Sequence, residues 1–150
     1  MIKETVAQLI KLHRTNNPFE IASQKNIKVL FEQLGEMMGY FNTYRRSAMI
    51  HINCNMDEKE QKFTCAHELG HLILHPKVNT PFLRKNTFYS IDRIEREANE
   101  FAVELLIPDD VIYQFQNSNT SIYEAAEAYG IPQEIIHLKS TPIHCSKFSY

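Results

Sequence analysis

The chain has 150 residues, with 16 Lys and Arg against 18 Asp and Glu, so its formal net charge is −2. Apolar residues make up 43 % and charged residues 23 %, as in an ordinary globular domain, and the length suits one domain over residues 1–150. The balanced charge disfavours a protein whose main task is to hold nucleic acid, and no apolar run is long enough to span a membrane.

Residues 1–53 are predicted to form two helices and three strands. Apolar residues at helical spacing predict a helix over residues 2–15, and Asn17, followed by a proline, begins a second, short helix. Three segments rich in β-branched and apolar residues are predicted strands: 27–31, 37–44 and 48–53. We expect these strands to form a small, twisted, mostly antiparallel sheet.

The rest of the chain is predicted to be helical. A capping box at Asp57 opens a helix that Pro76 ends, and Ser90 caps another over residues 91–107. Shorter helices are expected to begin at three further positions: Pro108, Ser121 and Pro132. The fold class is therefore α+β, with a core over about residues 15–110 and a helical extension over about 108–140.

The cysteines and the start of the chain indicate the compartment. Cys54, Cys65 and Cys145 are odd in number and irregularly spaced, which does not suggest a disulfide framework. The first residues do not read as a signal peptide, because the acidic Glu4 is followed by no long apolar stretch. We expect a cytoplasmic protein.

The segment His67-Glu68-Leu69-Gly70-His71 predicts a metal site. Two histidines four residues apart share one face of a helix, where both imidazoles can bind one Zn²⁺. Glu68 follows the first histidine and can take a proton from a water molecule at the metal, then pass it to the leaving amine. Since so short a pattern also arises by chance, the alternative is a helix with two surface histidines.

A third metal ligand is expected from the helix over residues 91–107. Glu95 falls on its apolar stripe, and Asn99, one turn later, can orient a ligand histidine. The opposite face is predicted to be solvated and carries four charged residues: Arg93, Glu97, Glu100 and Glu104. The alternative role of Glu95 is an ion pair with Arg84 or Lys85.

Peptide hydrolysis also needs a donor for the oxyanion of the tetrahedral intermediate. Four side chains are candidates: Tyr44, His75, Arg84 and Tyr89. The sequence does not choose among them, and each also fits an ordinary structural role. His75 lies two turns beyond His67, too far along a straight helix to join both motif histidines as a ligand.

Two blocks of sequence resemble the ImmA/IrrE family of zinc metallopeptidases. Residues 63–75 read FTCAHELGHLILH, and residues 95–108 read EREANEFAVELLIP. Segments 17–22 and 50–53 also resemble the family, so the resemblance covers roughly residues 15–110.

This resemblance implies a zincin-like fold, in which a small sheet packs on the metal helix and a second ligand helix lies behind. It implies His67, His71 and Glu95 as zinc ligands and Glu68 as general base and acid. Asn99 is a departure, because related peptidases often have Asp there. An amide can still hydrogen-bond an imidazole, but it lacks the charge that raises ligand basicity.

The implied function is a zinc endopeptidase that cleaves a helix-turn-helix transcriptional repressor and derepresses a phage or mobile element in a bacterial host. In zincins the substrate adds a strand to a sheet edge, and residues 48–53 are the natural candidate for that edge. The alternative is a non-catalytic antirepressor that sequesters the repressor in the same cleft. A weaker third reading is a zinc-stabilised DNA-binding regulator, based on a loose helix-turn-helix pattern over residues 122–135. Its surface charges are mostly acidic, so we expect no direct binding to nucleic acid, and no membrane partner.

Overall fold

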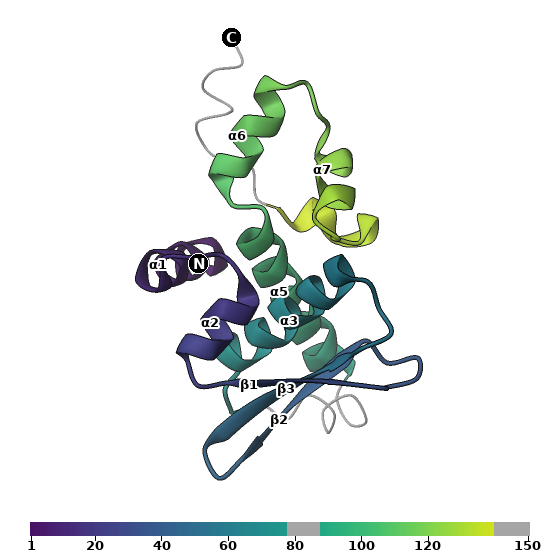
Figure 1. The fold of residues 1–150 in the computed structure, drawn as a ribbon. Helices are drawn as coiled ribbons and strands as arrows, with labels where there is room; N and C mark the ends of the chain where they lie inside the picture. The colour runs from purple at the N-terminus through teal and green to yellow at the C-terminus, as the bar shows by residue number, and fades with distance from the viewer. Residues whose placement is uncertain (78–87, 140–150) are drawn as a thin grey trace.

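The computed structural model describes residues 1–77 and 88–139, except for the side chains of residues 88–92. It has the predicted α+β class, with a three-stranded sheet on one side and helices on the other (Figure 1). The elements follow in chain order: α1 (Ile2–His13), α2 (Pro18–Gln24), β1 (Lys28–Glu32), β2 (Gly39–Tyr44), β3 (Ser47–Asn53), α3 (Glu58–Leu74), α5 (Phe88–Leu106), α6 (Asp109–Asn117), α7 (Ile122–Ala128) and the 3-10 helix η1 (Gln133–Leu138).

Most helix starts lie where the capping residues predict them. The side chains of Asn17, Asp57 and Ser121 each accept a hydrogen bond from a backbone N–H in the first turn of the following helix. Ser90 is the exception, because α5 begins at Phe88 and Ser90 is already helical. The prediction of a cap at Ser90 is therefore wrong.

The sheet is mixed rather than mostly antiparallel. Its strand order is β1-β3-β2, with β1 parallel to β3 and β2 antiparallel to β3. The chain crosses the end of β3 between β1 and β2, and the Asn53 side chain donates hydrogen bonds to the carbonyls of Gly35 and Met37 in that crossing, both at 2.9 Å. As a result β3 is the central strand, and the prediction that residues 48–53 form an edge is wrong.

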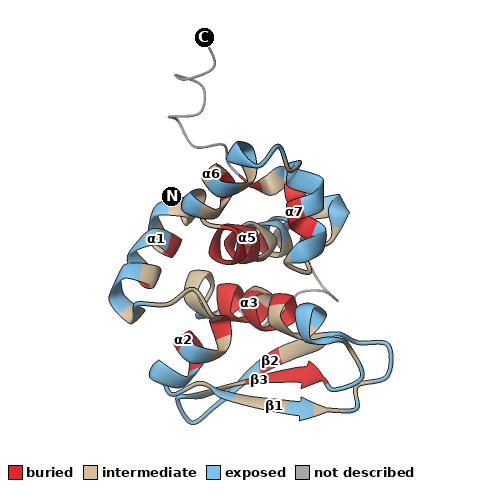
Figure 2. Cartoon of the chain, turned by 45° about the horizontal axis from the view of Figure 1, so that its top comes forward, coloured by how far each residue is buried: buried red, intermediate tan, exposed pale blue. Residues whose placement is uncertain are grey.

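The core lies between the sheet, α3 and α5, and Figure 2 shows the most buried segments on these two helices. Ile50 and Ile52 point from β3 into this core and are fully buried. Between the helices, a Cβ on Gly70 would lie 2.9 Å from Cδ1 of Phe101, a ring that is itself fully buried. The two helices thus approach more closely than any larger residue at position 70 would allow.

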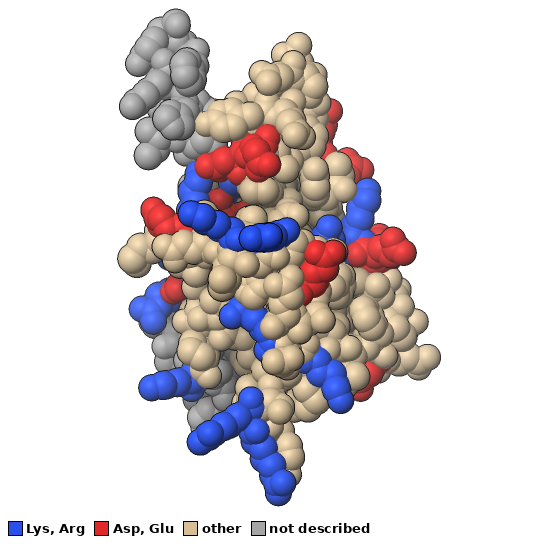
Figure 3. Space-filling model, turned by 60° about the vertical axis from the view of Figure 1, so that its left-hand side comes forward, with Lys and Arg blue, Asp and Glu red and all other residues tan. Residues whose placement is uncertain are grey.

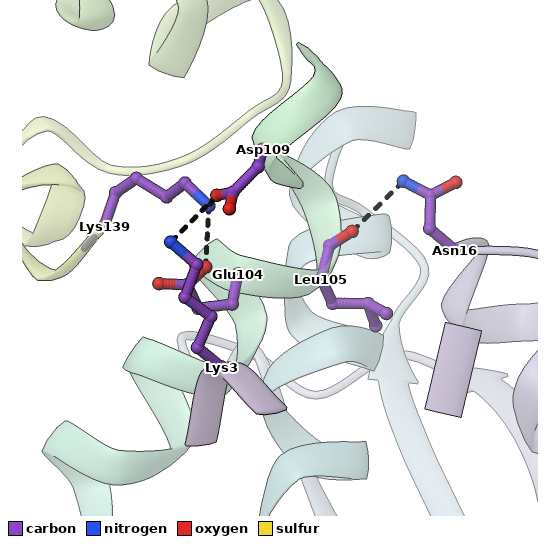
Figure 4. Close-up of polar contacts among 6 residues, drawn as sticks. All are labelled: Lys3, Asn16, Glu104, Leu105, Asp109 and Lys139. Carbon is purple, nitrogen blue, oxygen red and sulfur yellow. Dashed lines mark hydrogen bonds and ion pairs between the residues drawn. The ribbon is translucent and has the colours of Figure 1, made fainter. Parts of the chain in front are cut away.

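The predicted helical extension corresponds to α6, α7 and η1, and a buried ion pair joins its end to α5. Nζ of Lys139 lies 2.6 Å from Oε1 of Glu104 and 2.9 Å from Oδ1 of Asp109 (Figure 4). The side chains of Lys139 and Glu104 are only 1 % and 2 % exposed. The prediction of a solvated position for Glu104 is therefore wrong, because residue 139, far along the chain, folds back to cover it.

Lys3 adds a further cation beside Asp109, at 3.0 Å, and Asn16 donates to the carbonyl of Leu105 at 3.1 Å (Figure 4). These contacts tie the N-terminal helix and the segment that follows it to the same end of α5. Within the described residues, no helix is both long and apolar enough to cross a membrane.

Candidate metal centre

Three side chains from α3 and α5 converge on one point. The Nε2 atoms of His67 and His71 lie 3.1 Å apart. The carboxylate of Glu95 places one oxygen 3.1 Å from Nε2 of His71 and the other 3.2 Å from Nε2 of His67. Two ligands of a tetrahedral Zn²⁺, each ~2.0–2.1 Å from the ion, are separated by about 3.3–3.4 Å. The three donor atoms therefore have nearly the spacing that a single ion requires.

The histidines of this cluster lie in the interior rather than on the surface. The side chains of His67 and His71 are 13 % and 1 % exposed, and Nδ1 of each has no hydrogen-bond partner among the described residues. Each Nε2 could donate a hydrogen to one oxygen of Glu95, but the two N–H groups would then face each other at 3.1 Å. A divalent cation satisfies all three donor atoms, so the residues fit a metal ion.

The pKa values of the two histidines shift in opposite directions. Burial lowers the pKa of His67, but hydrogen bonding to Glu95 and the charges of Glu68 and Glu95 outweigh it, so the pKa is raised above 6.5. Burial keeps the pKa of His71 below 6.5 in spite of its own hydrogen bond to Glu95. The carboxylate of Glu95 thus favours positive charge at Nε2 of His67, in the place where a metal ion would supply it.

Glu68 lies beside the cluster and opens onto a cleft. The cleft has a volume of about 350 Å³ and is lined by His67, Glu68, Glu95 and Asn99 among other residues. Glu68 is 5 % exposed, so its carboxylate is shielded from bulk water but faces the cavity where a substrate carbonyl would lie. Cys65 lies on the same helix but in the core, and burial followed by the charge of Glu68 raises the pKa of its thiol to about 12. It is therefore an unreactive packing residue.

Asn99 lies where a residue that orients a ligand is expected. It follows Glu95 by one turn of α5 and lines the cleft together with His67, and it contributes to the raised pKa of His67. The structure thus brings it near the first motif histidine, while Nδ1 of that histidine has no hydrogen-bond partner among the described residues.

Of the four oxyanion candidates, the described residues include His75 and Tyr44, and neither lines the cleft. His75 ends α3, with Nε2 3.3 Å from an oxygen of Glu97. Tyr44 is 63 % exposed at the tip of the β2–β3 hairpin, beneath the guanidinium of Arg45. Arg84 and the side chain of Tyr89 lie outside the described residues, as does Lys85, the alternative partner of Glu95.

The wall of the cleft opposite α5 comes from residues that the sequence does not single out. Met37, Met38 and Gly39 precede and begin β2, and all three line the cleft. Met37 and Met38 are 52 % and 40 % exposed, unusually open for such apolar side chains. No spacing rule marks them, because only the position of β2 on the edge of the sheet brings them to the metal centre.

The edge strand beside the cleft is therefore β2, not residues 48–53. The amide of Asn53 donates to the carbonyl of Met38 at 2.9 Å. Since hydrogen-bonded pairs alternate along antiparallel strands, the backbone groups of Gly39, Phe41 and Thr43 are expected to point away from β3, toward the free edge.

Comparison with known proteins extends these findings. Residues 22–141 match the family model described as the IrrE N-terminal-like domain, which is classed among the peptidases. The match covers the cleft, both metal helices and the helical extension.

Two curated relatives are similar over most of the chain. "Uncharacterized immunity region protein 2" of Bacillus phage phi105 is 46 % identical over 140 residues, which are 93 % of this chain and 89 % of the relative. The metallopeptidase ImmA of Bacillus subtilis (strain 168) is 36 % identical over 113 residues, which are 74 % of this chain and 66 % of that protein.

Proposed function

Since this chain belongs to the peptidase family of IrrE N-terminal-like domains, we propose that it is a zinc-dependent endopeptidase that cleaves a helix-turn-helix transcriptional repressor. Cleavage would derepress a phage or mobile element. The observation that carries the proposal is the convergence of His67, His71 and Glu95 within 3.2 Å of one another, with Glu68 beside them in an open cleft. The immunity-region and metallopeptidase relatives support the biological setting.

In this proposal the two histidines and Glu95 hold the ion, and Asn99 orients His67. A bound Zn²⁺ would polarise the scissile carbonyl and make an attacking water molecule more acidic. These roles follow from the donor set, because two nitrogens and one carboxylate are a usual protein ligand set for catalytic zinc.

Glu68 acts as the proton carrier. Its carboxylate lies next to the ligand histidine and faces the cleft, where it takes a proton from the attacking water. The same carboxyl then delivers the proton to the nitrogen of the leaving amine. Its burial suits this exchange, because bulk water has little access to a carboxylate that is only 5 % exposed.

An extended segment of the substrate would pair with the free edge of β2. Main-chain hydrogen bonds to Gly39 and Phe41 would hold the scissile bond over the cleft. Thr43, exposed on the same edge, offers a test. Thr43→Pro removes one outward N–H and should slow cleavage roughly 5-fold, the value of one hydrogen bond, with metal content unchanged. Thr43→Ala is the control, and equal rates in both variants would exclude this edge.

The function is tested with any helix-turn-helix repressor that is found encoded beside this gene. It is co-expressed with the wild type or with Glu68→Gln, and fragments are identified by intact mass. A defined fragment with the wild type alone, and metal retained in both proteins, establishes a Glu68-dependent endopeptidase and gives the cleavage site. Stable co-purification without a fragment in either case would contradict proteolysis and favour the antirepressor.

A further inference from the structure

A second groove adjoins the metal cleft. It has a volume of about 670 Å³ and lies between α7, η1 and the start of α3, which Figure 1 shows close together. Met38 lines both the groove and the metal cleft. A polypeptide chain that leaves the metal cleft past Met38 would therefore enter this groove directly.

The lining of this groove is acidic, and we call it the acidic groove. Five carboxylates contribute to it: Asp57, Glu60, Glu124, Glu127 and Glu134. No Lys or Arg is among the described residues that line it, and none of the five takes part in an ion pair within residues 1–77 and 88–139. The face that carries α1 and α2 differs, because basic and acidic side chains are interspersed there (Figure 3). The concentration of one sign in a concave site raises the local concentration of cationic groups.

Exposed apolar side chains accompany the carboxylates. Tyr123 is 59 % exposed and Met38 is 40 % exposed, and both line the acidic groove. An aromatic ring and a thioether beside carboxylates suit Lys and Arg side chains, whose methylene stems pack on apolar surface while their charged ends reach acids. This combination distinguishes the acidic groove from a merely solvated acidic face.

The walls of the acidic groove are held in place before any ligand arrives. Gly130, with φ +74°, packs so closely on α3 that an added Cβ would lie 2.6 Å from Cβ of Lys59. Gln133 donates to the carbonyl of Tyr123 at 3.0 Å, and the buried pair of Lys139 and Glu104 fixes the end of η1. A preformed groove loses little conformational entropy when it binds a partner.

We propose that the acidic groove binds a Lys- and Arg-rich segment of the protein substrate, next to the bond that lies in the metal cleft. The proposal rests on the endopeptidase function proposed above and adds the class of sequence that the enzyme selects. Charge complementarity and continuity with the cleft through Met38 identify the occupant. The same carboxylates repel a nucleic acid backbone.

Peptide binding tests this proposal without need of turnover. The probe is a short fluorescein-labelled peptide of alternating Lys and Ala, with Gln-Ala and Glu-Ala peptides of equal length for comparison, and the readout is fluorescence anisotropy. We expect the Lys-Ala peptide to bind the wild type at least roughly 10-fold more tightly than the Gln-Ala peptide, less so as salt increases. The paired substitution Glu127→Lys with Glu134→Lys should remove this preference.

A matched control separates the acidic groove from net charge. Glu20→Lys with Asp110→Lys changes the net charge equally, at two exposed carboxylates outside the groove, and should leave the preference within about 2-fold of the wild type. Equal weakening in both variants, or no preference in the wild type, would overturn the proposal. If the Lys variant does not fold, as judged by circular dichroism, Glu127→Gln with Glu134→Gln replaces it and should reduce the preference in the same direction.

The outcome is distinguishable from the fate of the proposed function. If the wild type shows no preference for the Lys-Ala peptide but does show Glu68-dependent cleavage, the proposal of the acidic groove is wrong and the endopeptidase function stands. If the preference depends on the groove but no cleavage is seen, the binding surface is confirmed and the endopeptidase function is contradicted.

Discussion

Helix α5 carries a buried or half-buried glutamate in each of two regions, and the two glutamates have different kinds of partner. Near its C-terminal end, Glu104 meets Lys139, and Asp109 joins the same ammonium group. Nearer the start of the helix, Glu95 meets two imidazoles. Glu104 is 2 % exposed and the side chain of Glu95 is 25 % exposed, facing an open cleft.

Under the proposed function, the difference separates a cluster that stabilises the fold from one that binds a metal ion. At Glu104 the chain supplies its own cation, so charge and hydrogen bonding are complete within the protein. At Glu95 the partners are two imidazole nitrogens, which could bind a cation together with the carboxylate. We therefore expect Glu104, which pairs with a lysine of the same chain, to affect the stability of the fold. We expect Glu95, which could bind an external ion, to affect metal binding and activity. The following substitutions test this contrast.

The largest effect is expected at the functional end. Glu95→Gln should lose bound metal and cleavage by much more than the roughly 10–100-fold typical of residues that only orient a ligand. The metal-free protein should keep its free energy of unfolding within about 1 kcal/mol, since Glu95 is partly solvated. Metal content by elemental mass spectrometry and urea denaturation in chelator measure the two quantities. A full complement of metal in Glu95→Gln would contradict its assignment as a ligand.

The reverse pattern is expected at the structural end. Glu104→Gln leaves the buried ammonium of Lys139 with Asp109 alone, and should lower the free energy of unfolding by about 3 kcal/mol. Metal bound per folded molecule should not change. The double variant Glu104→Leu with Lys139→Met removes both charges and should recover most of the loss. A double variant no more stable than the single one would show that the unpaired charge is not the cause.

A smaller effect is expected where α5 orients a ligand without binding the ion. Asn99→Ala should weaken metal affinity roughly 10–100-fold, because His67 loses the polar neighbour proposed to orient its ring. Asn99→Asp restores a hydrogen-bond acceptor with charge and should bind metal at least as tightly as the wild type. Competition with a chromogenic chelator measures both affinities. Equal affinity of all three proteins would remove Asn99 from the metal centre.

The smallest effect concerns pH at the structural end. Hydrogen bonds from Lys139 and Lys3 hold the pKa of Asp109 below 3.8, against the opposing effect of partial burial. A lowered pKa adds stability above pH 3.8 that disappears as pH falls below this value. Asp109→Asn should therefore be less stable than the wild type at neutral pH, by less than about 1 kcal/mol because the side chain is 36 % exposed.

The gap between Asp109→Asn and the wild type should close as pH falls from 5 toward the pKa of Asp109, and urea denaturation across this range measures it. Asp110→Asn, an exposed neighbour in the same helical turn, is the control. A gap that stays constant with pH would contradict an electrostatic origin.

Local signals predicted most elements of this fold. Asn17, Asp57 and Ser121 cap the predicted helices, and Pro108 directly precedes α6. These features depend on neighbours in the sequence, so they can be derived from the chain without knowledge of its packing. The start of α5 was the exception, since a serine inside a helix resembles a cap when only the sequence is known.

Long-range features were predicted less well. The strands were located to within two residues, but their order was not, because pairing of β1 with β3 depends on where the intervening segment crosses the sheet. Helical spacing predicts Glu104 on the solvated face. The prediction fails because the partner of Glu104, Lys139, lies 35 residues later in the chain. The periodicity of one helix cannot predict a partner at that distance along the chain.

The sequence by itself determined which residues are available for metal chemistry. The spacing of His67, Glu68 and His71 and the inward position of Glu95 on its helix follow from local periodicity. The tertiary structure decided that Glu95 meets the histidines while Glu104 meets Lys139, and that β2, with Met38, forms the wall of the cleft and the entrance to the acidic groove. Helical spacing sets the direction of a side chain, but only packing between distant segments decides which charge or cavity it meets.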